Sequence, residues 1–218
     1  MPALAGLYAI TDAQLLPGAA LTTGVAAAIA GGARLIQYRD KGDDHPRRLR
    51  EAATLLQLCR EYHVPLIIND DVQLAAEIQA DGVHLGRHDP DVGQARRALG
   101  RAAIIGVSCY NEWPRAEVAR AMGADYLAFG AFFPSRTKPR AVPAQTTLLR
   151  RAKQELRLPV AAIGGITPAN GAALVAAGAD MLAVIQGLFA QPDVRRAASD
   201  YARLFHQDLS EKNTKDLI

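Results

Sequence analysis

Short apolar runs recur along the whole chain, and this rhythm constrains the fold more than any other feature of the sequence. Each run is rich in Val, Ile, Leu or Tyr and is only a few residues long, which is typical of a strand that is covered on both faces. The runs are Leu7–Ile10, Leu35–Tyr38, Leu66–Ile68, Gly82–Leu85, Ile104–Val107, Tyr126–Phe129, Val160–Ile163 and Met181–Ile185.

The segments between the runs have helical character. Residues 47–62 show it most clearly, with Leu49, Ala53, Leu56 and Arg60 at helical spacing. Gly-Ala pairs precede three of the runs, in "GGARLIQY", "GADYLAFG" and "GADMLAVI". A glycine in this place is typical of a helix C-terminus that leads into a strand.

Eight strands that alternate with helices predict a parallel sheet. In a chain of 218 residues, eight such repeats favour a (β/α)8 TIM barrel, an α/β fold with eight parallel strands. A doubly wound sheet is the alternative, but its glycine-rich turn after the first strand is missing from "YAITDAQLL". We expect one barrel domain over residues 1–209 and a polar, frayed tail over 210–218.

Composition excludes several other classes of protein. The net charge is +3, and no basic cluster is interleaved with aromatic residues, so we expect no nucleic-acid partner. Residues 158–179 carry no charge, but their glycines, Thr167, Pro168 and Asn170 favour a strand, loop and helix over a membrane span. Cys59 and Cys109 form no CxxC motif, and no signal peptide is visible, so we expect a cytoplasmic protein.

The residues that follow the strands indicate where the chemistry lies, because a barrel gathers functional groups at the C-terminal ends of its strands. Three cations, Arg39, Lys41 and Lys138, are predicted to converge there with the carboxylates Asp70 and Asp89. Arg and Lys suit phosphate oxygens, and a pair of carboxylates suits Mg²⁺. This combination predicts a site for a diphosphate and a magnesium ion.

A second, smaller anion site is predicted where Gly164 and Gly165 lead into a helix at Thr167 and Pro168, because backbone N–H groups there can hold an anion.

Each signal also has a structural interpretation. The "QYRDK" stretch resembles a surface charge run, Asp70 and Asp71 suit a helix N-cap, and "AIGGIT" is a common strand-to-helix turn. We interpret His84 as structural and Cys109 as inert.

Seven motifs together resemble those of the thiamine-phosphate synthase family, in the same order along the chain. They are "GLYAITD", "LIQYRDKG", "LIINDDVQLAAEIQADGVHLGRHD", "IIGVS", "GADYLAFGAFFPSRTKP", "PVAAIGGITPAN" and "GADMLAVI". The resemblance implies a transferase of thiamine biosynthesis on a (β/α)8 barrel. Its substrates would be a hydroxymethylpyrimidine diphosphate and a thiazole phosphate or the carboxylated form of the latter. Its products would be thiamine phosphate and pyrophosphate.

The resemblance also implies roles for individual residues. Asp70 and Asp89 would hold Mg²⁺, while Arg39, Lys41, Ser108 and Lys138 would act on the departing diphosphate. The pyrimidine diphosphate would contact Gln37, Tyr38, Arg39, Asp40, Lys41, Asn69, Ser108 and Lys138. The thiazole phosphate would contact Ser135, Arg136, Thr137, Gly165, Ile185 and Gln186. Two positions depart from the family. Its common Thr-x-Thr-Lys motif appears here as Ser135-Arg136-Thr137-Lys138, which keeps a hydroxyl at the first position, and it often has Ser in place of Gln186. Arg136 occupies the variable position of that motif.

Two alternatives remain at this point. A thiazole tautomerase of the same fold would not need the metal and diphosphate residues, and a non-catalytic thiamine-phosphate binding protein would tolerate loss of Asp70 and Asp89. Since all these residues are present, the synthase is favoured. We expect small-molecule partners, neither nucleic acid nor membrane, and the sequence leaves open a homo-oligomer.

Overall fold

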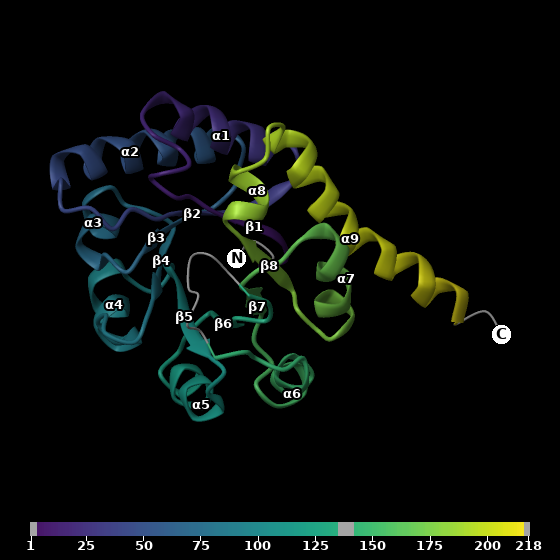
Figure 1. The fold of residues 1–218 in the computed structure, drawn as a ribbon. Coiled ribbons are helices and arrows are strands. Elements are labelled where there is room, and N and C mark those ends of the chain that lie inside the picture. Colours follow the sequence, from purple (N-terminus) through teal and green to yellow (C-terminus); the bar gives the residue numbers. More distant parts are fainter. Residues whose placement is uncertain (1–3, 135–141, 216–218) are drawn as a thin grey trace.

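The computed structural model describes residues 4–134 and 142–215. It confirms the predicted fold: eight parallel strands hydrogen-bond in sequence order, and β1 pairs with β8, so that the barrel is closed (Figure 1). The strands are β1 (Gly6–Ile10), β2 (Ala33–Tyr38), β3 (Leu66–Asn69), β4 (Gly82–Leu85), β5 (Ile104–Tyr110), β6 (Tyr126–Gly130), β7 (Val160–Ile163) and β8 (Met181–Val184).

Helices surround the barrel and fill the connections between its strands (Figure 1). They are α1 (Ala19–Ala30), α2 (His45–Glu61), α3 (Val72–Glu77), α4 (Val92–Leu99), α5 (Trp113–Ala121), α6 (Thr147–Glu155), α7 (Pro168–Ala176), α8 (Gln186–Phe189) and α9 (Val194–Lys215). Helix α9 packs against α1 and α7. Its last described residue is Lys215. In the part of the chain that is described, no helix is long and apolar enough to cross a membrane.

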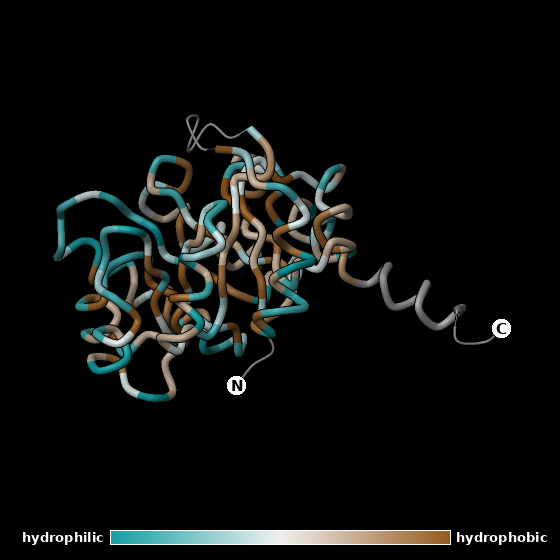
Figure 2. The backbone as a smooth tube through the Cα atoms, turned by 90° about the horizontal axis from the view of Figure 1, so that it is seen from below, coloured by the Kyte–Doolittle hydropathy of each residue, from teal (hydrophilic) through white to brown (hydrophobic). Residues whose placement is uncertain are grey.

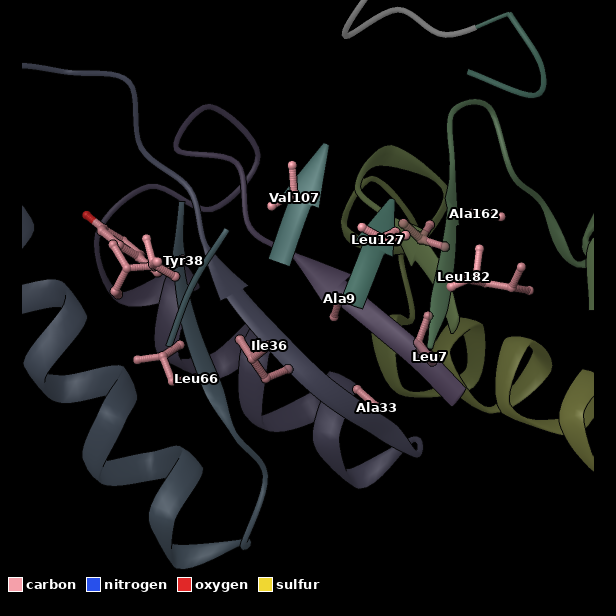
Figure 3. Close-up of a cluster of buried hydrophobic side chains, with 14 of the residues drawn as sticks. Leu7, Ala9, Ala33, Ile36, Tyr38, Leu66, Val107, Leu127, Ala162 and Leu182 are labelled. Atoms are coloured by element: carbon pink, nitrogen blue, oxygen red, sulfur yellow. The ribbon is translucent and has the colours of Figure 1, made fainter. Parts of the chain in front are cut away.

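The hydrophobic core has two layers because successive strand residues point to opposite faces. Leu7 and Ala9 lie in the outer layer between strands and helices, whereas Tyr8 and Ile10 lie in the inner layer inside the barrel. Figure 3 shows part of the outer layer, in which Leu7, Ile36 and Leu182 of three different strands lie close to the helices. In Figure 2, hydrophobic stretches run through the body of the molecule, and several of the peripheral loops are hydrophilic.

Local sequence signals explain how the helices begin and end. Asp44, Asp71, Asp91 and Thr167 each accept a hydrogen bond at the N-terminus of a helix, as N-cap residues do. The glycines predicted after three helices, Gly32, Gly123 and Gly178, all have positive φ, at 106°, 88° and 108°. This left-handed conformation favours glycine and turns the chain into the next strand.

The helix predicted over 47–62 is present as α2, but its buried face differs from the four residues that showed the helical spacing. The buried face of α2 is Ala52, Leu55, Leu56 and Cys59, whereas Ala53 and Arg60 are exposed. The reason is geometric, because neighbouring residues on a helix differ by about 100° in direction. The face defined by Leu49 and Leu56 is therefore rotated by about one residue from the buried face, which includes Leu55.

Candidate active site

A cavity of about 350 Å³ opens at the C-terminal ends of the strands. Residues at or just after several strands line it, as expected for a barrel. Its walls include Tyr8, Ile10, Gln37, Arg39, Asn69, His84, Ser108, Tyr110, Ala128, Gly130, Ile163, Gly164, Gly165, Ile166, Thr167, Ile185 and Gln186. The volume and the mixture of apolar walls with a few polar groups suit a small organic ligand.

Two carboxylates lie beside this cavity and approach the same point above Gly86. A methyl group added at Gly86 would lie 2.9 Å from Asp89 Oδ2, 3.6 Å from the Tyr110 hydroxyl and 3.8 Å from Asp70 Oδ1. Lys41 reaches the cluster from the loop after β2 and donates to Asp70 Oδ2. The predicted convergence of Lys41, Asp70 and Asp89 is therefore present.

The two carboxyl groups lie close together, and their interaction separates their pKa values. Burial alone would raise the pKa of Asp70, but the Lys41 ammonium and the nearby Asp89 hold the pKa of Asp70 below its ordinary value. Burial and the nearby Asp70 raise the pKa of Asp89. Two carboxylates so close repel each other when both are charged, and a cation placed between them would relieve that repulsion.

Neighbouring aspartates of the "NDD" motif have different tasks. Asp71 accepts a hydrogen bond from the Leu74 N–H at 2.9 Å and caps α3, as the structural interpretation of the motif predicts. Asp70 has a φ of 63°, a conformation uncommon for residues other than glycine. It lies between the end of β3 and the helix cap, with its carboxyl group toward Lys41 and Asp89.

Arg39 lines the cavity from the end of β2. Its guanidinium is 3.3 Å from Asp12 Oδ2, and its backbone N–H donates to Thr11 Oγ1 at 2.9 Å. Both Arg39 and Asp12 side chains retain 21% of their accessible surface. The loop after β1 thus holds Arg39 in place while leaving it accessible to an anion.

Two residues taken from the resemblance, Tyr38 and Asp40, do not lie at the cavity. Tyr38 belongs to the outer layer (Figure 3), where its hydroxyl donates to Glu51 of α2 at 2.7 Å. Asp40 accepts from the Gly42 N–H and pairs with Arg47, 2.6 Å away. Both side chains point toward α2 because residues at even spacing along β2 share a face. Gln37 and Arg39 alternate with them and face the cavity.

The structure brings together a polar group inside the barrel that the sequence analysis missed. His84, interpreted as structural, lines the cavity and lies 2.8 Å from Ser108 Oγ and 2.9 Å from the Tyr126 hydroxyl. Tyr8 in turn bonds to Tyr126 at 2.7 Å. The sequence carried no signal for this group, because the alignment of His84, Gly106 and Tyr126 across β4, β5 and β6 depends on the strand register.

Arg115 of α5 is a second residue that the sequence analysis missed. Its guanidinium donates to the backbone carbonyls of Ser108 at 2.6 Å and Gly86 at 2.7 Å. It therefore ties the loop that carries Asp89 to the end of β5.

The opposite side of the cavity is built from backbone rather than charge. Gly164 and Gly165 have φ of 105° and 61°, and a methyl group on Gly165 would lie 2.4 Å from the Pro134 carbonyl oxygen. Helix α7 follows, with Thr167 as its N-cap. Ile185 and Gln186 line the same side at the start of α8. Ser135, Arg136, Thr137 and Lys138 lie outside the described residues.

These features define a class of protein: a (β/α)8 barrel whose mouth combines cations, a carboxylate pair and a glycine-rich loop. A family model described as thiamine monophosphate synthase matches residues 7–188. The chain belongs to this thiamine monophosphate synthase family, whose members are transferases.

Individual relatives agree with this assignment. A thiamine-phosphate synthase from Nitrosococcus oceani is 54% identical over 200 residues, which is 92% of each chain. One from Thiobacillus denitrificans is 50% identical over 206 residues, 94% of this chain and 97% of the relative. Among solved structures, a thiamine phosphate pyrophosphorylase from Pyrococcus furiosus has a TM-score of 0.84 at 34% identity, covering 94% of this chain and 96% of its own.

Proposed function

We propose that this chain is a magnesium-dependent thiamine-phosphate synthase in which Gln37, Arg39, Lys41, Asn69, Ser108 and Lys138 bind the pyrimidine diphosphate. The second substrate is a thiazole phosphate or its carboxylated form, held near Ser135, Arg136, Thr137, Gly165, Ile185 and Gln186. The single observation that carries the proposal is the cluster of Lys41, Asp70 and Asp89 beside a cavity whose opposite wall is a glycine-rich loop.

The side of the cavity near β2 to β5 suits the pyrimidine diphosphate. Arg39 and Lys41 supply positive charge for phosphate oxygens, and Gln37, Asn69 and Ser108 supply hydrogen-bonding groups within the cavity. The cavity itself is wide enough for a ring but closed below by Tyr8 and Ile10. We assign the ring to the cavity and the diphosphate to the cations at its rim.

The carboxylate pair fits Mg²⁺. No group of three or more His, Cys, Asp and Glu side chains gathers as a metal site among the described residues. Mg²⁺ does not need one, because it commonly takes one or two carboxylates and completes its shell with phosphate oxygens and water. Asp70 and Asp89 would hold the ion, which when bound would neutralise charge on the diphosphate.

The wall from β7 and β8 suits the phosphate of the second substrate. Backbone N–H groups of a glycine loop before a helix attract anions, and Gly165 lies two residues before Thr167, the N-cap of α7. Gln186 adds an amide at the start of α8. These two loops would therefore contribute backbone N–H groups and an amide, rather than charged side chains, to the binding of this phosphate.

The reaction then needs little besides charge and orientation. The bond between the pyrimidine methylene carbon and the diphosphate oxygen breaks, and its electron pair leaves with pyrophosphate. The thiazole nitrogen gives its lone pair to that carbon and forms the new C–N bond, and a carboxylated thiazole also releases CO₂. Arg39, Lys41 and Lys138 stabilise the charge that develops on the leaving oxygens. The protein holds both rings in one cavity, so that attack becomes intramolecular in effect.

The test is to incubate the purified full chain with both substrates and Mg²⁺ and to measure thiamine phosphate and pyrophosphate. We expect both products in equal amounts, and none after chelation of the metal with EDTA. Glu155→Gln is a suitable control variant for loss of a carboxylate, because Glu155 pairs with Arg151 within α6 and does not line the cavity. Rearrangement of the thiazole without condensation would instead indicate a tautomerase. Tight binding of thiamine phosphate without turnover would indicate a binding protein.

A further inference from the structure

Five polar side chains form a continuous line of hydrogen bonds across the interior of the barrel. Gln37 Nε2 donates to the Tyr8 hydroxyl, which bonds to the Tyr126 hydroxyl at 2.7 Å. Tyr126 bonds to His84 Nδ1 at 2.9 Å, and His84 Nε2 bonds to Ser108 Oγ at 2.8 Å. We call these five side chains the interior chain. Its two ends, Gln37 and Ser108, both line the cavity.

The middle of the interior chain is almost completely buried. Tyr8 keeps 1% of its accessible surface and Tyr126 keeps none. Their rings meet edge to face with centroids 5.9 Å apart, and His84 stacks on Tyr126 with centroids 5.5 Å apart. Gly106 makes room for this arrangement, because a methyl group there would lie 2.0 Å from the Tyr126 ring.

Burial sets the direction of the bonds at Tyr8. Tyr8 accepts from Gln37, and within the described part of the chain its other partner is the Tyr126 hydroxyl. If Tyr126 donated to Tyr8, the hydroxyl hydrogen of Tyr8 would be buried without an acceptor, which is strongly unfavourable. Tyr8 therefore donates to Tyr126. Burial also raises the pKa of both phenols, so that both keep their hydrogens.

The same reasoning gives the donor and the acceptor of each remaining hydrogen bond, from Tyr126 to Ser108. Tyr126 accepts from Tyr8, so its own hydrogen goes to His84 Nδ1. A neutral imidazole that accepts at Nδ1 carries its hydrogen on Nε2. That hydrogen goes to Ser108 Oγ, and the hydroxyl hydrogen of Ser108 is left for the cavity. At the other end the Gln37 amide nitrogen is held by Tyr8, and this orients its carbonyl oxygen as an acceptor.

We propose that the interior chain presets the polarity of the ring site, with an acceptor at Gln37 and a donor at Ser108, and that Tyr126 is the positioning residue that links them. This inference rests on the proposed function, because it takes the ligand to be the aminopyrimidine diphosphate. An amino group donates to Gln37, and an acceptor atom of the same molecule receives the Ser108 hydroxyl. An analogue with a carbonyl in place of the amino group would meet an acceptor at Gln37 and be rejected.

The first test reads the direction of the chain without any measurement of activity. Nitrogen-15 NMR of the full chain distinguishes the two imidazole tautomers, and the sequence has five histidines. The His84 signals are those that disappear in His84→Asn. We expect neutral His84 to carry its hydrogen on Nε2. A hydrogen on Nδ1 would reverse every bond of the chain and overturn the proposal.

The second test uses Tyr126→Phe, which removes one hydroxyl and keeps the ring. We expect the KM for the pyrimidine diphosphate to rise about tenfold, equivalent to one lost buried hydrogen bond. The preference for the amino substrate over the carbonyl analogue should fall by a similar factor. The KM for thiazole phosphate should stay within about twofold of the wild-type value, because a mutation at one site has little effect on a separate, uncoupled site. Tyr201→Phe is the matched control, because it removes a buried hydroxyl that donates to the Ile166 carbonyl and takes no part in the interior chain. It should leave the pyrimidine KM within about twofold.

Unchanged discrimination in a folded Tyr126→Phe protein, or equal pyrimidine effects in both variants, would overturn the proposal. Failure of the wild-type chain to form thiamine phosphate would overturn the proposed function instead. The tautomer of His84 would still report the direction of the interior chain in that case.

Discussion

The two sides of the cavity are built by different means. Loops after β2, β3 and β4 bring charged side chains, namely Arg39, Lys41, Asp70 and Asp89, whereas the loops after β7 and β8 bring glycines and uncharged residues. The charged side relies on ion pairs such as Lys41 with Asp70. The backbone side relies on the conformation of Gly164 and Gly165. Under the proposed function, one barrel mouth would recognise two phosphorylated molecules, one mainly through charged side chains and the other mainly through backbone groups.

This contrast also predicts how the two sides respond to mutation. On the charged side, replacing one side chain removes a full charge and changes one contact. On the backbone side, replacing a side chain removes little, but adding a Cβ changes the path of the chain. The largest effects should therefore come from charge removal on one side and from glycine substitution on the other.

The largest effect is expected for Asp70→Asn and Asp89→Asn. Each should lower turnover at ordinary Mg²⁺ by about 100-fold or more, because removing one group that stabilises developing charge has that magnitude. Steady-state kinetics over a Mg²⁺ titration checks this, with thermal unfolding as a control for the fold. A variant that keeps full activity at ordinary Mg²⁺ would remove that aspartate from the metal site.

Arg39→Ala comes next. It should raise the KM for the pyrimidine diphosphate about tenfold to 100-fold, since a charge-assisted hydrogen bond contributes about 1.5–3 kcal/mol. The KM for thiazole phosphate should change by less than about threefold, as expected for separate sites. Measuring both constants tests the comparison directly. Equal losses for the two substrates would contradict the division of the cavity into two sides.

Lys138 and Arg136 are two cations on the loop after β6, outside the described residues, and comparing their variants tests which of them acts on the diphosphate. The family resemblance places Lys138 at the diphosphate and leaves Arg136 at a variable position. We expect Lys138→Ala to reduce turnover by more than about tenfold, through charge stabilisation in the transition state. Arg136→Ala should change it by less than about threefold, as is usual for an exposed charge. The reverse order would show that the phosphate-binding cation lies two residues earlier.

On the backbone side, Gly165→Ala should raise the KM for thiazole phosphate about tenfold, because left-handed backbone costs a residue with a Cβ about 1–2 kcal/mol. The added methyl would also lie 2.4 Å from the Pro134 carbonyl oxygen, so the loop would shift. Kinetics with each substrate varied in turn measures the effect. Gly100→Ala is the control, since Gly100 also has positive φ, at 85°, but has no atom near its added Cβ. An unchanged thiazole KM in Gly165→Ala would remove this loop from the second site.

The contrast between the sides also explains what could be predicted from the sequence. The eight strands were located to within a few residues, because continuous apolar runs are a strong signal when both faces are covered. Once the strands were located, the charged residues that follow them could be assigned to the mouth, because the C-terminal ends of the strands meet there. The Gly-Ala pairs predicted the helix ends, since the need for positive φ is local.

What depends on three-dimensional closure could not be predicted. Tyr8 and Tyr126 are 118 residues apart and meet only because β1 and β6 face each other across the barrel. His84 alternates with apolar neighbours, so the sequence alone does not show that it faces the cavity. Asp70 and Asp71 are identical residues, and only the left-handed φ of Asp70 separates a site residue from a helix cap.

The smallest effect is expected for Tyr38→Phe, which tests geometry against resemblance. Tyr38 lies in the "QYRDK" motif between Gln37 and Arg39. The family resemblance implies that every residue of this motif contacts the pyrimidine diphosphate, and Tyr38 is therefore included. Strand alternation places it on the opposite face, where its hydroxyl donates to Glu51 at 2.7 Å. Losing this bond should lower the free energy of unfolding by about 1 kcal/mol. For a chain of this size the melting temperature should then fall by about 2–4 °C.

Both Michaelis constants of Tyr38→Phe should match those of the wild type, because its hydroxyl lies behind β2 and away from the cavity. Thermal unfolding and two-substrate kinetics on the same preparation provide the comparison. A pyrimidine KM raised as in Arg39→Ala would mean that Tyr38 reaches the ligand despite its position. β2 would then have to present neighbouring residues to one face, which a regular strand cannot do.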